Sequence, residues 1–245
     1  MRHSAKEILM YLNKIHKGNW DLIFKDVQQK TEIPEEIDIE QSHNCVCILD
    51  PDYPVKLKNC FKAPFTLYYC GNLALLNEDN IMCVCGENGA NKDTLDLIKH
   101  VCDSYVLISG DDSAIERAAL QTAMSEHKQF IIVLNEPIDV AVDWDDELIL
   151  YAMHNNCLII SEYGYESPEI DESELAKTRI IGFLADKMLV VSGSRRNTRL
   201  KLLIDESLCK GNDIFALPSA PFQRSLTNLI IREGAILVDD KECIF

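Results

Sequence analysis

The sequence has no long hydrophobic run. Its apolar runs, such as Phe130–Leu134 and Met188–Val191, are far shorter than the roughly 20 residues that a transmembrane helix needs. The first residues, MRHSAKEILMYLNK, are typical of a charged amphipathic helix and lack the apolar core and cleavage site of a signal peptide. We therefore expect a protein with no membrane partner, located by default in the cytoplasm.

Patterns of common catalytic and metal sites are also missing. The six histidines are scattered, and none adjoins a GxSxG elbow or an HExxH pair. Two CxC pairs, Cys45/Cys47 and Cys83/Cys85, each lie in a predicted strand, where alternate residues share one face. No second half-site stands at zinc spacing, so we favour buried, reduced thiols over metal ligands or disulfides. We expect no enzyme activity, no metal and no cofactor.

Basic residues are few, since 24 Lys and Arg stand against 40 Asp and Glu, a net charge of −16. Such a charge repels phosphate, so the surface as a whole is not a nucleic-acid footprint. Between Lys187 and Arg232, however, eight basic residues face three acids, a local charge of +5. The basic residues are Lys187, Arg195, Arg196, Arg199, Lys201, Lys210, Arg224 and Arg232. Positive charge is therefore concentrated in one stretch.

Short apolar runs alternate with longer amphipathic ones from Ile81 onward. The predicted strands are Ile81–Cys85, Tyr105–Ser109, Phe130–Leu134, Cys157–Ser161, Met188–Val191, Ile214–Leu217 and Ile236–Val238. The predicted helices are Lys92–Cys102, Ser113–Glu126, Asp145–His154, Glu172–Leu184, Thr198–Cys209 and Ser225–Arg232. This alternation predicts an α/β fold with a doubly wound, mostly parallel sheet over residues 42–245. Residues 1–41 predict a small helical N-terminal region of two short helices.

Ligands of such sheets bind where the strands end, so each predicted strand end is a candidate contact. Gly86 and Gly89 could form a phosphate loop or an ordinary turn. Ser109 and Gly110 precede Asp111, Asp112 and Ser113, for which we favour helix capping without a ligand.

At the next strand end, Ser161 precedes Glu162, which could accept a ribose hydroxyl or a base amino group, or be a solvated acid.

The stretch SGSRRNTRL, Ser192 to Leu200, is the most informative of these ends. Three arginines in five residues repel one another without an anion, and their forks fit phosphate oxygens. The hydroxyl and amide groups of this loop precede a helix N-terminus, which also favours anions. We favour anion binding over a basic loop paired with surface acids. Arg179 on the preceding helix and Arg224, Ser225 and Asn228 after the next strand are predicted to lie nearby.

In order along the chain, these segments resemble the DprA/Smf family of DNA-processing proteins. YPVKLKNCFKAPFTLYYCGN resembles its YP-x-x-L…P…L-Y-x-x-G-N segment, and IISEY its SE-Y/F strand end. AKTRIIGFLADKMLVV, NDIFALPS and NLIIREGAILV resemble its P-x-RNRII, R-x-VFAVPG and N-x-LI-x-x-GA segments. The resemblance covers Pro51 to Asp239. It implies an extended Rossmann-like domain that binds single-stranded DNA, often as a homodimer, and helps to load RecA.

The chain also departs from the family pattern. Asn88 stands where the family's GSR motif has arginine, and Leu120 where its SG-x-A-x-GID-x-x-AH motif has histidine. Lys177 and Thr178 replace the RN pair before Arg179. Because the sequence stops at Phe245, we expect the family's C-terminal winged helix to be missing. The arginines of the SGSRRNTRL loop would compensate for the cations that these family motifs have lost.

The leading hypothesis is a non-enzymatic protein that binds single-stranded DNA in DNA uptake, natural transformation and RecA-dependent recombination. The predicted contacts are Gly86, Asn88, Ser109, Gly110, Ser161, Glu162, Arg179, Ser194, Arg195, Arg196, Asn197, Thr198, Arg199, Lys201, Arg224, Ser225 and Asn228. The alternatives are a Rossmann-like pocket for a nucleotide or phosphorylated metabolite, as a sensor or hydrolase, and a scaffold that has lost DNA binding.

Overall fold

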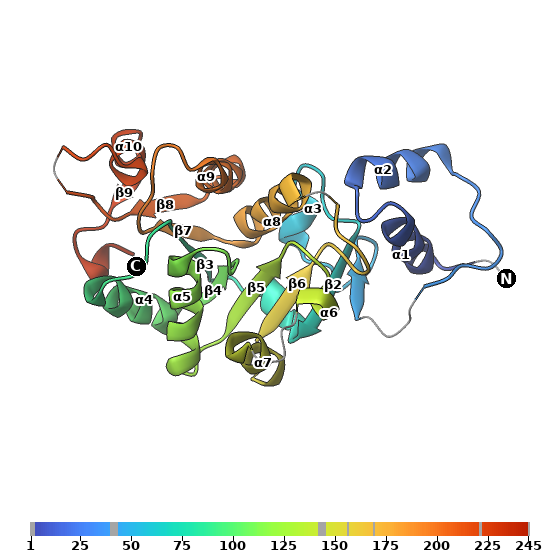
Figure 1. The fold of residues 1–245 in the computed structure, drawn as a ribbon, viewed down its shortest axis with the longest axis horizontal. Helices are drawn as coiled ribbons and strands as arrows, with labels where there is room; N and C mark the ends of the chain where they lie inside the picture. The colour runs from blue at the N-terminus through green and yellow to red at the C-terminus, as the bar shows by residue number, and fades with distance from the viewer. Residues whose placement is uncertain are drawn as a thin grey trace.

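A computed structural model describes residues 3–39, 44–141, 146–155, 157–168, 170–220 and 222–244 (Figure 1). These residues form a nine-stranded sheet in the order β1-β2-β6-β5-β4-β3-β7-β8-β9. The strands are β1 (Cys45–Cys47), β2 (Thr66–Gly71), β3 (Ile81–Cys85), β4 (Val106–Ser109), β5 (Phe130–Leu134), β6 (Leu158–Ser161), β7 (Lys187–Val190), β8 (Asp213–Ala216) and β9 (Ile236–Leu237).

Helices connect and cover these strands. They are α1 (Ala5–Ile15), α2 (Trp20–Gln29), α3 (Val55–Lys58), α4 (Lys92–Ser104), α5 (Ala114–Ser125), α6 (Ile138–Ala141), α7 (Glu147–His154), α8 (Ile170–Leu184), α9 (Thr198–Lys210) and α10 (Leu226–Arg232), with 3₁₀ turns η1 (Leu73–Asn77) and η2 (Lys241–Ile244). The first residue of the predicted helix Asp145–His154 lies outside the described residues. No helix among the described residues is long and apolar enough to cross a bilayer.

The predicted α/β class is confirmed. Strands β3 to β9 pair in parallel, and β1 and β2 extend one edge of the sheet with antiparallel pairing. From β3 the chain builds outward through β4, β5 and β6, then returns to place β7 on the other side of β3. Cys85 at the end of β3 is in register with Val190 at the end of β7. The carboxyl ends of β3 and β7 therefore form a topological switch point.

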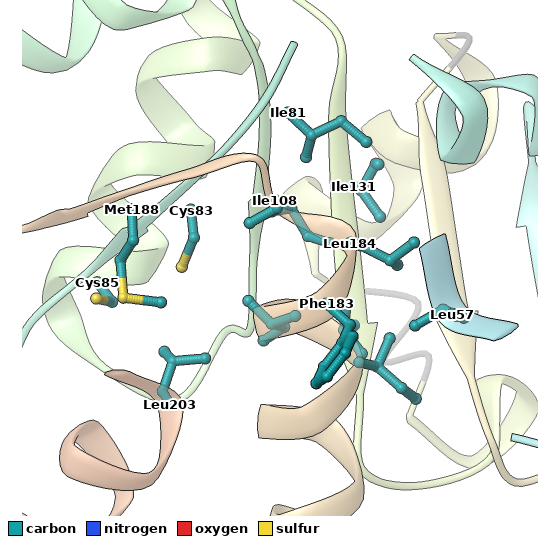
Figure 2. Packing of buried hydrophobic residues seen from close by; sticks show 14 of the residues in the cluster. Leu57, Ile81, Cys83, Cys85, Ile108, Ile131, Phe183, Leu184, Met188 and Leu203 are labelled. Atoms are coloured by element: carbon teal, nitrogen blue, oxygen red, sulfur yellow. The ribbon is translucent and has the colours of Figure 1, made fainter. Parts of the chain in front are cut away.

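Both faces of the sheet are buried. Helices α8 and α9 cover one face, and α4, α5 and α7 cover the other (Figure 1). Cys83 and Cys85 point to the first face and pack near Met188 and Leu203, as their alternate spacing predicts (Figure 2). All ten cysteines are free and seven are buried, although Cys209 is exposed. The thiols of the strand pairs therefore act as small apolar groups of the core.

Helices α1 and α2 confirm the two predicted N-terminal helices. Ser4 and Glu7 form a capping box at the start of α1, and Asn19 caps α2. Hydrogen bonds tie this pair to the rest of the chain; among them, Asn13 Nδ2 donates to the Glu162 carbonyl at 3.0 Å, and Trp20 Nε1 donates to the Ala63 carbonyl at 2.8 Å. The predicted boundary between residues 41 and 42 lies outside the described residues and stays a prediction.

The turn between α1 and α2 requires a glycine. Gly18 has φ +73°, and a Cβ there would lie 2.3 Å from Cδ1 of the buried Tyr163 ring. Gly18→Ala is expected to lower the free energy of unfolding by about 2–4 kcal/mol, because it combines left-handed strain with overpacking. Urea unfolding measures this loss. The control is Gly89→Ala, where a Cβ meets no atom within 4 Å. Equal stability of both variants would contradict the prediction.

Candidate functional site

The loops that follow β3 and β7 meet at the switch point. A Cβ on the buried Gly86 would lie 3.0 Å from Ile115 Cγ2 and 3.1 Å from Ser192 Oγ, so a side chain would push the loops apart. Ser192 Oγ accepts hydrogen bonds from the backbone N–H groups of Glu87 and Asn88 at 3.3 and 3.1 Å. In return, the Glu87 carboxylate accepts the Ser194 N–H at 2.5 Å. The two loops therefore satisfy each other's polar groups.

The β7–α9 loop is also fixed to the β8–α10 loop. Ser194 and Ser225 form an isolated β-bridge, and Leu226 N donates to the Gly193 carbonyl at 2.7 Å. Arg195 Nε donates to the Ser225 carbonyl at 3.1 Å, which holds this side chain across the joint. The two loops, thirty residues apart in sequence, therefore lie side by side and form one continuous surface.

Three predicted contact residues shape these loops through their side chains. Asn197 caps α9 by accepting the Leu200 N–H at 2.9 Å, and Ser225 caps α10 by accepting the Asn228 N–H at 3.0 Å. Asn228 in turn accepts the Ser219 N–H at 3.0 Å. These groups hold the backbone in place. Thr198, the first residue of α9, is exposed.

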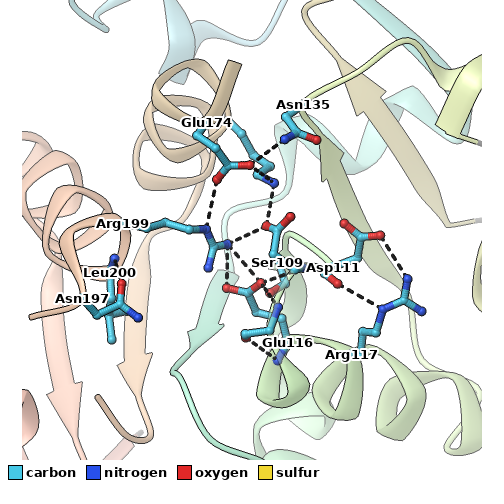
Figure 3. Close-up of polar contacts among 12 residues, drawn as sticks. Ser109, Asp111, Glu116, Arg117, Asn135, Glu174, Asn197, Arg199 and Leu200 are labelled. Carbon is cyan, nitrogen blue, oxygen red and sulfur yellow. Dashed lines mark hydrogen bonds and ion pairs between the residues drawn. The ribbon is translucent and has the colours of Figure 1, made fainter. Parts of the chain in front are cut away.

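Arg199 points away from this surface, toward α5 and α8. Its Nη2 lies 2.8 Å from both Asp112 Oδ2 and Glu116 Oε1, and its Nε lies 3.2 Å from Glu174 Oε2 (Figure 3). Lys177 completes this ion-pair cluster of Asp112, Glu116, Glu174, Lys177 and Arg199. Its Nζ lies 2.5 Å from Asp112 and 2.9 Å from Glu174, and its side chain is fully buried.

The ion-pair cluster corrects the prediction that Arg199 is free to bind an anion. Burial lowers the pKa of the Arg199 guanidinium, but the Glu116 and Asp112 carboxylates outweigh it and hold that pKa above its ordinary value. Burial raises the pKa of the Glu116 carboxyl, against the opposing effect of Arg199. An external phosphate would have to displace three internal carboxylates to reach Arg199. This arginine therefore joins helices instead.

Arg179 and Glu162 form a second internal ion pair. Arg179 is 8% exposed and Glu162 4%, and Arg179 Nη2 contacts Glu162 Oε2. Burial raises the pKa of the Glu162 carboxyl, while Arg179 lowers it. Both residues were predicted to contact the ligand, and the structure corrects this because each is buried and its charge is paired with the other.

The serines at two strand ends are also internal. Ser109 is 2% exposed and its Oγ donates to the Val84 carbonyl at 3.1 Å. Ser161 is fully buried, and its Oγ donates to the Glu136 carbonyl at 2.7 Å. Gly110 is buried too, and a Cβ there would lie 2.9 Å from Asp112 Oδ2. These predicted contacts, too, are inaccessible to a ligand.

Four basic side chains remain accessible: Arg195, Arg196 and Arg224 in the two joined loops, and Lys201 in the first turn of α9. Arg196 and Arg224 are exposed, and Arg195 and Lys201 are half-buried. Within the part of the chain that the structure describes, no carboxylate forms an ion pair with any of them. We call these four residues the basic edge. Asn88 is exposed in the neighbouring β3–α4 loop.

Several residues that were not among the predicted contacts determine which arginines are free of internal ion pairs. Glu174 and Lys177 occupy i and i+3 on α8, a spacing that predicts an ion pair, but not its contact with Arg199. Glu116 forms a capping box with Ser113, which predicts a helix start without predicting the arginine beside it. No sequence pattern indicates that Glu87 binds the β7–α9 loop, because exposed acidic residues are common in turns.

Comparison with known proteins gives a consistent result. Residues 44–245 match the family model of DNA recombination-mediator protein A. The chain is 29% identical to the DNA processing protein DprA of Streptococcus pneumoniae over 197 residues, which cover 78% of this chain and 69% of that protein. It is 22% identical to the DNA processing protein DprA of Bacillus subtilis over 213 residues, covering 84% of this chain and 71% of that protein.

Two solved structures share the fold. DNA processing protein A from Streptococcus pneumoniae superposes with a TM-score of 0.73 and 24% identity, over 98% of this chain and 92% of that one. DNA processing protein A from Helicobacter pylori, described for its unique single-stranded DNA binding mode, superposes with a TM-score of 0.68 and 18% identity. The superposition covers 83% of this chain and 94% of that one.

Proposed function

The chain belongs to the DNA recombination-mediator protein A family, and we propose that it binds the backbone of single-stranded DNA at its basic edge. The Helicobacter pylori relative supports the ligand, since it is described for binding single-stranded DNA. In this proposal the protein acts by binding rather than by catalysis. It works as a homodimer in DNA uptake, natural transformation and RecA-dependent recombination, which agrees with the family's role as recombination mediators.

The observation that carries the proposal is the difference between the two sets of cations. Arg179, Lys177 and Arg199 are bound to internal carboxylates, whereas the basic edge has no such partner among the described residues. Guanidinium groups that lack an internal anion are available to phosphate oxygens, which they bind with two parallel hydrogen bonds. The β-bridge between Ser194 and Ser225 holds the two loops of the basic edge together, so neighbouring phosphates of one strand can be bound at once.

The binding energy comes mainly from charge. Each phosphate that a Lys or Arg neutralises releases counterions from the strand, and the affinity therefore falls as salt is added. Phe222, a fully exposed ring two residues before Arg224, offers a face on which a base can stack. Few other aromatic rings adjoin the loops, so stacking contributes less than charge.

The alternative of a nucleotide pocket relies on three acids at strand ends, Asp111, Asp112 and Glu162, to bind a ribose, and each of these carboxylates is paired within the protein. Asp112 is held by Lys177 and Arg199, and Glu162 is buried against Arg179. Asp111 lies within 3.4 Å of Arg117. These carboxylates are paired within the protein, so their proposed contact with ribose hydroxyls would require them to leave a partner.

Fluorescence anisotropy with labelled oligo-dT tests the proposal. We expect binding at low salt, with log K falling against log salt at a slope of about −3, as four cations on a single strand imply. Mononucleotides should not raise the melting temperature. Absence of binding at low salt, or stabilisation by a mononucleotide without oligo-dT binding, would contradict the proposal.

A further inference from the structure

One acidic side chain of the neighbouring β3–α4 loop reaches the loops that carry the basic edge. Glu87 directly follows Gly86 at the end of β3, and its carboxylate accepts the Ser194 N–H at 2.5 Å. Ser194 immediately precedes Arg195 and Arg196. The Glu87 carboxylate is therefore bound to the same loop as two of the free arginines.

The contact is accessible from outside. Glu87 is exposed and Ser194 is half-buried, so an external oxygen can compete for the Ser194 N–H. The neighbouring N–H groups of Glu87 and Asn88 are already bound to Ser192 Oγ, a neutral acceptor. The Ser194 N–H is thus the position in these loops where an anion is already bound, and that anion is part of the protein.

Glu87 has no cation of its own in the part of the chain that the structure describes. This distinguishes it from the carboxylates of the ion-pair cluster, whose charge is balanced by Arg199 and Lys177. The Glu87 carboxylate, which has no counterion among the described residues, both occupies the Ser194 N–H donor and repels an approaching phosphate.

We propose that Glu87 is an internal competitor of the DNA phosphate at the Ser194 N–H. This inference rests on the proposed function and deepens it, because it names the group that limits the affinity of the basic edge. A phosphate oxygen of the strand can accept this N–H only after the Glu87 side chain has turned away. The carboxylate is held near the N–H by its own backbone, so its effective concentration is high. Glu87 therefore weakens binding.

Two substitutions separate competition for the N–H from simple charge repulsion. Glu87→Gln removes the charge but keeps an acceptor oxygen, whereas Glu87→Ala removes both. We expect E87A to bind oligo-dT about tenfold more tightly than the unmodified protein, the size of one hydrogen bond to a charged group. The oligo-dT affinity of E87Q should lie between those of E87A and the unmodified protein. The control pair is E136Q and E136A, which remove the same charge from an exposed acid that follows β5.

The outcomes are distinct. Equal affinities for E87Q and E87A would mean that only charge matters and would overturn competition for the N–H. E87A affinity within twofold of E136A would overturn the inference while leaving the proposed function intact. If the unmodified protein fails to bind at low salt but E87A binds, the proposed function fails for the unmodified protein while the competition is supported. If no variant binds at low salt, both the inference and the proposed function fail.

Discussion

Replacing Glu162 with alanine is expected to lower the free energy of unfolding by about 3–5 kcal/mol, because it leaves a buried arginine without its counterion. Arg179 is 8% exposed, and its Nη2 group contacts the Glu162 carboxylate. Its Nε has no hydrogen-bond partner among the described residues, so Glu162 is the main source of compensation for this charge. The loss would be large because a guanidinium ion cannot shed its proton to become neutral.

Glu162 also lies where the N-terminal helices meet the sheet. Its backbone carbonyl accepts the Asn13 amide of α1 at 3.0 Å, and Tyr163 packs on Gly18. Disruption of the ion pair should therefore loosen the contact of α1 and α2 with the rest of the chain. Hydrogen exchange would show this as faster exchange of α1 amides in the Glu162→Ala variant.

Urea unfolding at neutral pH measures the predicted loss. The matched double variant, Glu162→Gln with Arg179→Met, removes both charges and should recover most of the stability that E162A loses. A loss of less than about 1 kcal/mol for E162A, the range of exposed pairs, would contradict the assignment of a buried ion pair. So would a double variant whose loss equals the sum of the single losses.

The sequence was a good guide to the parallel part of the sheet. The strands Ile81–Cys85 and Phe130–Leu134 end where they were predicted, because strands covered on both faces read as unbroken apolar runs. Strand β2 was not predicted. Its residues are buried from Thr66 to Tyr68 and exposed at Gly71, and its antiparallel pairing with β1 and β6 depends on contacts distant in sequence.

At the candidate site, the sequence predicts which residues are basic but not which of them are free to bind a ligand. Sequence located three arginines in one loop, but side-chain direction decides their role. Arg195 and Arg196 precede the Asn197 cap, whereas Arg199 is the second residue of α9 and turns toward α5 and α8. Arg179 lies between buried positions of α8, a pattern that indicated burial more strongly than ligand contact. Which cations are free depends on carboxylates from other elements, and no local pattern contains that information.

The combined substitution Arg195→Ala and Arg196→Ala is expected to weaken oligo-dT binding about 100-fold at low salt. Each arginine contributes roughly tenfold, the size of one hydrogen bond between charged groups. The fold should be unaffected, because Arg196 is exposed and Arg195 makes one hydrogen bond to a backbone carbonyl.

Two other arginines provide controls. Arg232 is exposed in the last turn of α10, so Arg232→Ala removes one charge away from the joined loops and should change affinity by less than about twofold. Arg199→Ala should destabilise the protein, because it leaves Glu116 buried without its guanidinium. Its folded fraction should still bind DNA. Weak binding by R199A, once corrected for folding, would place the phosphate contact at the ion-pair cluster instead.

The dependence of oligo-dT affinity on salt, measured for the unmodified protein and for the double arginine variant, tests the role of the basic edge most directly. We predict that the slope of log K against log salt becomes shallower by about 1.4 in the double variant, since two phosphate contacts on a single strand are lost. Arg232→Ala should leave the slope unchanged. Equal slopes for the unmodified protein and the double variant would show that DNA is bound elsewhere, or not through these arginines.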